Sequence, residues 1–365
     1  MIAPGIPLTP KPMGAHTTIT DLVDNYFLAY NAARLREACQ LMASQILQPD
    51  VVVGVTLSGA LTPAGFSGAV LAPLMEAGFI DWIVSTGANL YHDMHRSLGF
   101  TLFGSTPFVD DVALAEQGLI RIYDILFDQD VLYKTDRYIA ERIETPEFQR
   151  RMGTAEVHNR LGRCLFELEE TAGITQKSLL ATAYAMGVPI YTSSPGDSSL
   201  GMNIAAGRLR GNALSIDAER DVNETAALVH HTKRNGKKSA LVIFGGGSPK
   251  NFALQTEPQI REVLGLQEEG HDYYVQITDA RPDTGGLSGA TPSEAVTWGK
   301  VNPNQLPNTV VCYCDSTIAL PILSAYVLSK VSPRPLNRLY DLRDEMLDNL
   351  TEEYLGTVHA NRNEE

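Results

Sequence analysis

Short runs rich in valine and isoleucine alternate with segments of helical periodicity, and this alternation restricts the fold more than any other feature of the sequence. The strand-like runs lie at 50–60, 80–89, 188–201, 237–252, 271–280 and 308–316. Buried apolar strands joined by helices are typical of a parallel sheet whose two faces are covered. We therefore predict an α/β fold with a parallel sheet, helices on both faces, and an extra helical region in the first half, at about 111–183.

The bulk composition is that of a globular protein, since 44% of the 365 residues are hydrophobic and 20% are charged. No shift in composition marks a boundary, so we predict a single domain over 1–365. Within it we expect an extended, proline-containing arm at 1–20 and a C-terminal tail at 340–365. No apolar run reaches the length of about 18 residues that a membrane span needs, and the N-terminus does not resemble a secretory signal. We therefore expect no membrane partner and a cytoplasmic location.

The net charge and the cysteine content indicate which classes of partner and which redox compartment to expect. A formal net charge of −14 argues against a nucleic-acid footprint, which requires basic patches. The acidic balance suits cationic small molecules, although it also serves solubility alone. The 4 cysteines are too sparse for a disulfide scaffold, which favours a reducing cytoplasm.

Small or acidic residues follow six of the strand-like runs, at the points where the strands end. Ligands of parallel α/β sheets bind beyond the carboxyl ends of the strands. Acidic residues there can bond the hydroxyl groups of a ribose, or they can cap the next helix. The sequence leaves both interpretations open. The strand-end residues are Ser58-Gly59, Ser85-Thr86-Gly87, Ser193 to Asp197, Gly245-Gly246-Gly247, Thr278-Asp279 and Asp315-Ser316.

A run of three glycines, 245–247, lies between a strand and a helix in "VIFGGGSPKNF". Glycine permits a close backbone approach and a positive φ, and the N-terminus of a helix can receive an anion such as a pyrophosphate. The run matches neither G-x-G-x-x-G nor a Walker A loop, so a nucleotide site and a tight structural turn remain alternatives.

Lys300 stands at the end of "SEAVTWGK", beside Trp298 and six residues after Glu294. A lysine amine becomes a nucleophile when burial or a neighbouring charge lowers its pKa. Trp298 could hold a cation on its ring, and Glu294 could bind an amine. The alternative is an exposed lysine at a helix end. His92 and His95 lack a third ligand at suitable spacing, so we predict no metal site.

The segment "SEAVTWGK" closely resembles the active-site lysine segment of the deoxyhypusine synthase family, whose signature is E-A-V-S-W-G-K. The likeness extends over roughly residues 20–335 and includes "VGVTLSGALTPAG", "IVSTGANLYHD", "SSPGDSSLG", "ALVIFGGGSPKN" and "VVCYCDSTIALPIL". It implies a Rossmann-like sheet, NAD as cofactor, and a homotetramer with active sites at subunit interfaces. It also implies a reaction in which NAD oxidises a polyamine, a lysine captures the C4 unit as an imine, and a second amine accepts it.

The resemblance assigns roles to individual residues. Lys300 matches the nucleophilic lysine, and Glu294 and Trp298 match residues of the substrate site. The expected cofactor contacts are Thr56, Ser58, Thr86, Gly87, Asp93, Asp197, Gly246, Gly247, Asp315 and Ser316.

Several positions depart from the pattern of the eukaryotic enzymes, and all of them belong to the residues that hold spermidine. Met202 replaces an acid, Asn251 and Phe252 replace paired histidines, and Gln276 replaces a tyrosine. Leu287 replaces the loop acid before Ser288, although Asp283 lies nearby. We therefore expect a substrate pocket formed by Glu294, Trp298, Ser288, Asp283, Phe252, Asn251 and Met202 that differs from theirs. This pattern resembles the bacterial and archaeal deoxyhypusine synthase-like branch.

Three functions follow from this resemblance. The first is an NAD-dependent C4 aminoalkyl transferase that joins small amines such as agmatine, putrescine or spermidine, for example into homospermidine. The second is deoxyhypusine synthase itself, which modifies a lysine of a protein. The third is a non-catalytic NAD-binding protein. The presence of Lys300, Glu294 and Trp298 favours an enzyme, and the altered pocket favours the first.

Overall fold

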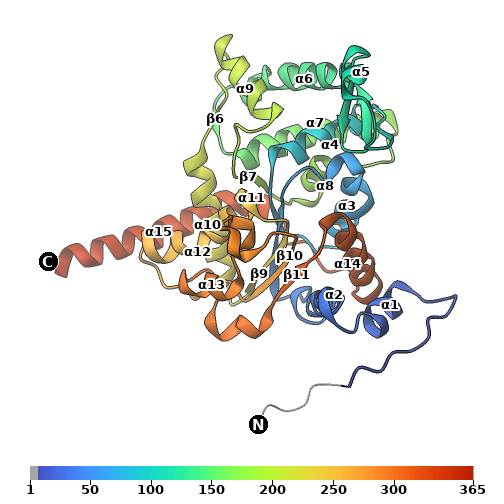
Figure 1. The fold of residues 1–365 in the computed structure, drawn as a ribbon. Coiled ribbons are helices and arrows are strands. Elements are labelled where there is room, and N and C mark those ends of the chain that lie inside the picture. The colour runs from blue at the N-terminus through green and yellow to red at the C-terminus, as the bar shows by residue number, and fades with distance from the viewer. Residues whose placement is uncertain (1–6, 365) are drawn as a thin grey trace.

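All six apolar runs become strands of one parallel sheet in the computed structural model, which describes residues 7–364. Figure 1 shows this sheet at the centre of the molecule. The spatial order is β11-β10-β9-β1-β2-β7. The strands are β1 (Val51–Leu57), β2 (Trp82–Ser85), β7 (Ile190–Thr192), β9 (Lys238–Phe244), β10 (Tyr273–Thr278) and β11 (Thr309–Tyr313).

The order of the strands is that of a doubly wound dinucleotide-binding sheet. If the six strands are numbered along the chain, their spatial order is 3-2-1-4-5-6. Each half of the sheet contains three consecutive strands, and the first strands of the two halves, β1 and β9, are neighbours. The chain crosses over between β7 and β9, so the direction of winding reverses between β1 and β9. Ligands of such sheets bind in the crevice beyond the strand ends at this reversal. The Rossmann-like fold expected from the resemblance is confirmed.

Helices cover both faces of the sheet, because alternate residues of each strand enter different cores. Val53 and Val55 of β1 join the core formed with α2 and α14, whereas Val52 joins the core formed with α10. Figure 1 shows α2 and α14 on one side of the sheet and α10, α12 and α15 on the other. A fully buried strand of this kind shows a continuous apolar run rather than an alternation.

The helices follow the predicted alternation with the strands. They are α1 (Ile19–Tyr26), α2 (Tyr30–Leu41), α3 (Ala72–Glu76), α4 (Gly87–Ser97), α5 (Asp111–Glu116), α6 (Gln129–Ile143), α7 (Thr154–Ala172), α8 (Leu179–Met186), α9 (Ser199–Leu209), α10 (Ala218–Arg234), α11 (Gly247–Leu254), α12 (Thr256–Pro258), α13 (Pro292–Thr297), α14 (Ser316–Lys330) and α15 (Arg343–Glu364). No helix among residues 7–364 is long and apolar enough to cross a membrane.

The predicted helical region at 111–183 is present as α5 to α8, with two interruptions that the sequence pattern did not predict. An antiparallel hairpin, β4 (Leu119–Ile122) and β5 (Ile125–Asp128), separates α5 from α6, and β3 (Phe103–Gly104) pairs with β5. Its two-residue turn begins at Tyr123, whose φ is 54°. The short runs of the hairpin are apolar but fall between two helices, where periodicity alone does not separate strand from helix. A second small pair joins β6 (Arg151–Met152) to β8 (Ser215–Ile216).

The two ends of the chain differ from each other in structure. Residues 7–18 form no helix or strand before α1, in keeping with an extended arm, and residues 1–6 of that prediction lie outside the described residues. The segment predicted as a tail, 340–365, is instead mostly the helix α15. Met346 and Leu350 of this helix are buried against the core that includes α10. Residue 365 again lies outside the described part.

A buried ion pair joins the segment after α14 to the sheet, and we predict that breaking it destabilises the fold. Arg334 contacts the Asp81 carboxylate at 2.5 Å and also donates to the carbonyl oxygens of Gln48 and Val51. Removing one partner of such a pair leaves an unpaired buried charge, which costs about 3–5 kcal/mol. Arg334→Met should lower the free energy of unfolding by that amount in urea titrations.

The matched control is Arg338→Met, because Arg338 forms a partly exposed pair with Asp341. Pairs of that kind contribute at most about 1 kcal/mol. Equal losses in the two variants would contradict the prediction.

Candidate active site

The strand-end residues meet at one edge of the sheet because all six strands run in the same direction. Ser58 follows β1, Thr86 and Gly87 follow β2, and the glycine run follows β9. Ser193 to Asp197 follow β7, and Asp315 and Ser316 follow β11. The sequence therefore predicted correctly that these groups meet at one edge of the sheet, and the reversal between β1 and β9 brings Ser58 beside the glycines.

The glycine run makes a close contact across the reversal. The Gly246 N–H donates to Ser58 Oγ at 3.0 Å, and the Gly247 N–H donates to Ser288 Oγ at 2.8 Å. Gly245 and Gly247 have φ angles of 82° and 54°, which favour glycine. A Cβ atom at Gly246 would lie 2.5 Å from the Cα atom of Ser288. Only glycine permits this approach of the turn to the loop that carries Ser288.

The same edge fits a dinucleotide. Four helices of eight or more residues, α4, α9, α11 and α14, begin there directly after strands, and their N-terminal N–H groups favour an anion such as a pyrophosphate. Three buried hydroxyls at these strand ends and helix starts, those of Thr56, Thr192 and Ser198, have no hydrogen-bond partner among the described residues. Unpaired donors in such a place suit a polar ligand. The donor set therefore fits the NAD expected from the resemblance.

Several of the predicted cofactor contacts bond the protein itself, as Ser58 does at Gly246 and Thr86 does at the start of α4. The Asp93 carboxylate is buried, and it accepts the N–H groups of Leu179 and Leu180 at 2.7 and 3.3 Å. Burial raises the pKa of Asp93 to about 7. Its geometry therefore assigns it to the N-terminus of α8 rather than to a cofactor. Asp315 caps α14 through the Thr317 N–H at 2.8 Å, yet it remains at the strand-end edge.

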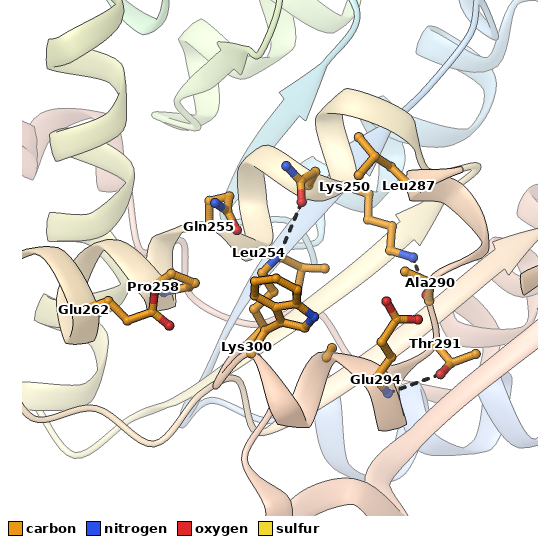
Figure 2. Close-up of a pocket in the computed structure, with 13 residues that line it drawn as sticks. Lys250, Leu254, Gln255, Pro258, Glu262, Leu287, Ala290, Thr291, Glu294 and Lys300 are labelled. Atoms are coloured by element: carbon orange, nitrogen blue, oxygen red, sulfur yellow. Dashed lines mark hydrogen bonds between the residues drawn. The ribbon is translucent and has the colours of Figure 1, made fainter. Parts of the chain in front are cut away.

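A cavity of about 310 Å³ opens beside this edge, between α11, the segment of α12 and the π-helical turn Gln259–Val263, and α13 (Figure 2). It is about the smallest size typical of ligand pockets. Its walls are formed by Lys250, Asn251, Leu254, Gln255, Pro258, Glu262, Leu287, Ala290, Thr291, Glu294, Ala295, Trp298 and Lys300.

The backbone N–H and the backbone carbonyl of Lys300 are both hydrogen-bonded, which fixes the residue beside this cavity. Its N–H donates to the Ala295 carbonyl at 3.0 Å, and its carbonyl accepts the N–H of the buried His271 at 3.1 Å. Gly299 turns the chain with a φ of 66° and packs directly against Arg261. The end of α13 and the hydrogen bond from His271, two residues before β10, thus fix the backbone from which the Lys300 side chain extends.

The Lys300 amine has the surroundings of a nucleophile. Its Nζ donates to Asn251 Oδ1 at 3.3 Å and lies 5.6 Å from the centre of the Trp298 ring. Burial lowers the pKa of Lys300, while the negative charges of Glu262 and Glu294 act in the opposite direction. Since burial is the larger effect, more of the amine is neutral at a given pH than in an ordinary lysine.

We predict that Lys300 reacts with amine reagents at lower pH than an exposed lysine does. A lowered pKa increases the neutral, reactive fraction below the usual titration range. Reductive methylation with formaldehyde and cyanoborohydride is followed by peptide mass spectrometry over a pH series. The pH at which half of Lys300 is methylated should be lower than the pH at which half of Lys177, an exposed lysine in a surface ion pair, is methylated. A coincident or higher midpoint for Lys300 would contradict the prediction.

The predicted substrate residues divide into two groups. Asn251, Glu294, Trp298 and Lys300 line the cavity, and Ser288 lies next to its wall. Phe252, Asp283 and Met202 do not line it. Asp283 is exposed and paired with Arg281, and Met202 is 65% exposed on α9. In the single chain, Asp283 and Met202 therefore do not line the pocket that contains Lys300.

Lys250, Glu262 and several apolar residues line the cavity but were not predicted from the sequence. Four wall residues, Lys250, Leu254, Pro258 and Glu262, are spaced by four positions. That spacing places side chains on one face of a helix, and the α11–α12 region is helical over this range. The periodicity was therefore a usable signal, although nothing local indicated that this face would meet Lys300.

Comparison with known proteins gives consistent results. A family model described as "Deoxyhypusine synthase" matches residues 21–327. The chain is 61% identical over 352 residues to the "Deoxyhypusine synthase-like protein" of Nostoc punctiforme, covering 96% of this chain and 90% of that protein. It is 35% identical over 323 residues to "Probable deoxyhypusine synthase 2" of Methanosarcina acetivorans, covering 88% of each. A solved structure assigned to deoxyhypusine synthase from Entamoeba histolytica superposes with a TM-score of 0.57 over 89% of this chain and 98% of that one. At 11% identity this last likeness concerns the fold alone.

Proposed function

The chain belongs to the deoxyhypusine synthase family, and from this premise we propose that it is an NAD-dependent transferase that moves a C4 aminoalkyl unit between small amines through an imine on Lys300. The family is one of NAD-dependent aminobutyl transferases. The observation that carries the proposal is the Lys300 amine, partly buried and bonded to Asn251 inside a cavity that also holds two carboxylates.

The two carboxylates of the cavity suit a donor substrate that carries a positive charge at each end. Figure 2 shows Glu262 and Glu294 on opposite sides of the Lys300 side chain. Leu254, Pro258 and Ala295 supply apolar wall between them. An aliphatic diamine has a charged group at each end and methylene groups between, so it matches this distribution of charge and apolar surface. Putrescine is such a diamine, and spermidine and agmatine likewise carry a charged nitrogen group at each end of an aliphatic chain.

The chemistry assigns one task to each group. NAD held at the strand-end edge, beside Ser58 and the glycine run, would supply a hydride acceptor for the carbon next to the donor nitrogen and a hydride for the final step, which would leave the overall reaction redox-neutral. The neutral Lys300 amine attacks the carbon of the oxidised donor, and the C–N bond to the leaving amine breaks. Asn251 orients the Lys300 amine through its Oδ1 atom, and Glu294 and Glu262 hold the ammonium groups of the substrates. The second amine then displaces Lys300 from the same carbon.

We further propose that a second copy of this chain covers the site. Trp298 is 58% exposed and Leu287 is 50% exposed, although both line the cavity. A reactive imine requires exclusion of water. The homotetramer expected from the family would supply that cover.

The proposal is tested by product analysis. The purified protein with NAD is incubated separately with putrescine, spermidine and agmatine, and the products are identified by mass spectrometry. A condensed amine with loss of ammonia, diaminopropane or the corresponding leaving amine is expected from at least one of them, and none without NAD. The absence of any condensed small amine, with transfer to a protein lysine instead, would favour deoxyhypusine synthase activity and overturn the proposal.

A further inference from the structure

The strongest unexplained feature next to the site is a buried hydrogen-bond network centred on Gln276 of β10. Gln276 and Lys250 are 1% and 2% exposed, so neither exchanges its bonds with water. A buried amide can form four strong hydrogen bonds, two as donor and two as acceptor. Gln276 forms all four.

The four bonds of Gln276 connect separate parts of the site. Its Nε2 donates to the carbonyl of Gly245 in the glycine turn at 2.9 Å and to the carbonyl of Ser288 at 2.8 Å. Its Oε1 accepts the Tyr274 hydroxyl at 2.6 Å and the Lys250 ammonium at 3.1 Å. The side chain therefore joins the edge that fits the dinucleotide to the loop that forms one wall of the lysine pocket.

Lys250 completes the same network from α11. Its Nζ donates to Gln276 Oε1, to the Ser288 carbonyl at 3.3 Å and to the Ala290 carbonyl at 2.6 Å. An ammonium has three donors, and here all three have neutral oxygen acceptors. Burial lowers the pKa of Lys250 to about 8, partly offset by Glu294. The 287–291 loop is thus tied to α11 and β10 through backbone carbonyls, and it leads directly into α13 with Glu294 and Lys300.

We propose that Gln276 and Lys250 are a positioning pair, which sets the spacing between the glycine turn and the Lys300 pocket. This inference rests on the proposed function for its catalytic readout. Neither side chain has to contact the reacting atoms. A displacement of about 1 Å at a reacting centre can lower the rate about 100-fold, so loss of the pair should act mainly on turnover.

The test compares Gln276→Leu, Lys250→Met and the double variant. Each single change leaves the remaining polar group buried with fewer partners, which destabilises the fold. The double change leaves neither side chain of the pair unpaired, although the carbonyls of Gly245, Ser288 and Ala290 still lose bonds. The melting temperature of the double variant should therefore fall by less than the sum of the two single losses. Turnover of whichever amine the wild type converts should nevertheless stay about 10- to 100-fold low, with a smaller change in KM. The matched control is Lys237→Met, because Lys237 is a part-buried lysine directly before β9. This variant should retain wild-type turnover.

A second readout does not depend on turnover. The pH midpoint of Lys300 methylation should rise in Gln276→Leu and in the double variant, because a loosened loop admits water and relieves the burial of the amine. The charged groups near Lys300 are Glu262, Arg261, Glu294 and Lys250. All four remain in Gln276→Leu, which therefore tests the loosened loop alone. The double variant loses Lys250, and removing that positive charge shifts the midpoint in the same direction.

Wild-type turnover together with a wild-type Lys300 profile in the double variant would overturn the proposal and leave the pair a purely structural role. If the double variant fails to fold, the nearly isosteric Gln276→Glu takes its place, since it loses the Nε2 donor to Gly245 and Ser288. Wild-type turnover in that variant would overturn the proposal equally. If the wild type converts no amine, the proposed function fails, and the Lys300 profile still decides the role of the pair.

Discussion

Lys300→Ala should abolish amine transfer while leaving the fold and NAD binding intact. Removal of a nucleophile that forms the covalent intermediate lowers turnover by at least about 1,000-fold, because no other group offers the same bond. Within residues 7–364 the side chain forms a single hydrogen bond, to Asn251, so its loss should change the melting temperature little. Product formation is measured by mass spectrometry with the amine that the wild type converts.

The covalent step can be observed directly. Sodium borohydride added during turnover reduces an imine to a stable amine, so the wild-type protein should gain the mass of one C4 unit on the peptide that contains Lys300. Lys300→Ala should show no such adduct, and Lys177→Ala, which removes an exposed lysine of a surface ion pair, should behave as the wild type. An adduct on another lysine, Lys250 included, would contradict the assignment of the nucleophile.

Neutralising both carboxylates of the cavity should have the next largest effect, on substrate binding rather than on turnover. Glu294 and Glu262 line the pocket on either side of Lys300. A hydrogen bond to a charged group contributes about 1.5–3 kcal/mol, which corresponds to about 10-fold or more in affinity. Glu294→Gln and Glu262→Gln should each raise the KM for the amine about 10-fold, and the double variant about 100-fold.

A matched control separates this effect from a general loss of negative charge. Glu219 is 85% exposed and paired with Arg151 away from the cavity, and Glu219→Gln should leave KM unchanged. Because Glu262 and Glu294 both raise the pKa of Lys300, their removal should also move the midpoint of Lys300 methylation to lower pH. A lower midpoint with an unchanged KM would mean that the carboxylates face the lysine but do not hold the substrate.

The sequence was a good guide wherever the signal was local. Runs such as 51–57 are mostly apolar, since both faces of a parallel strand are buried, and each becomes a strand of the sheet. Because the strands are parallel, the residues that follow them lie together at the carboxyl-end edge of the sheet. The glycines at 245–247 and the short segment that ends in Lys300 were recognisable for the same reason, because a close backbone approach and a tight turn restrict the residues at each position.

The hairpin at 119–128 and the helix α15 show where local patterns were insufficient. The hairpin strands are four residues each, too short for periodicity to separate them from the surrounding helices. The helix α15 has charged residues throughout its length, and its buried face becomes evident only through its contact with α10.

By itself the sequence determined the class of fold and the edge of the sheet at which the strand-end residues meet, and it predicted Lys300 as the nucleophile. Tertiary structure alone decided the strand order that brings Ser58 to the glycine turn, the orientation of Asp93 toward α8 and the four bonds of Gln276. It also decided that Glu262 faces Lys300. The physical reason is that hydropathy and turn residues specify a segment's own conformation, whereas the direction and partners of a buried polar side chain depend on segments far away in the chain.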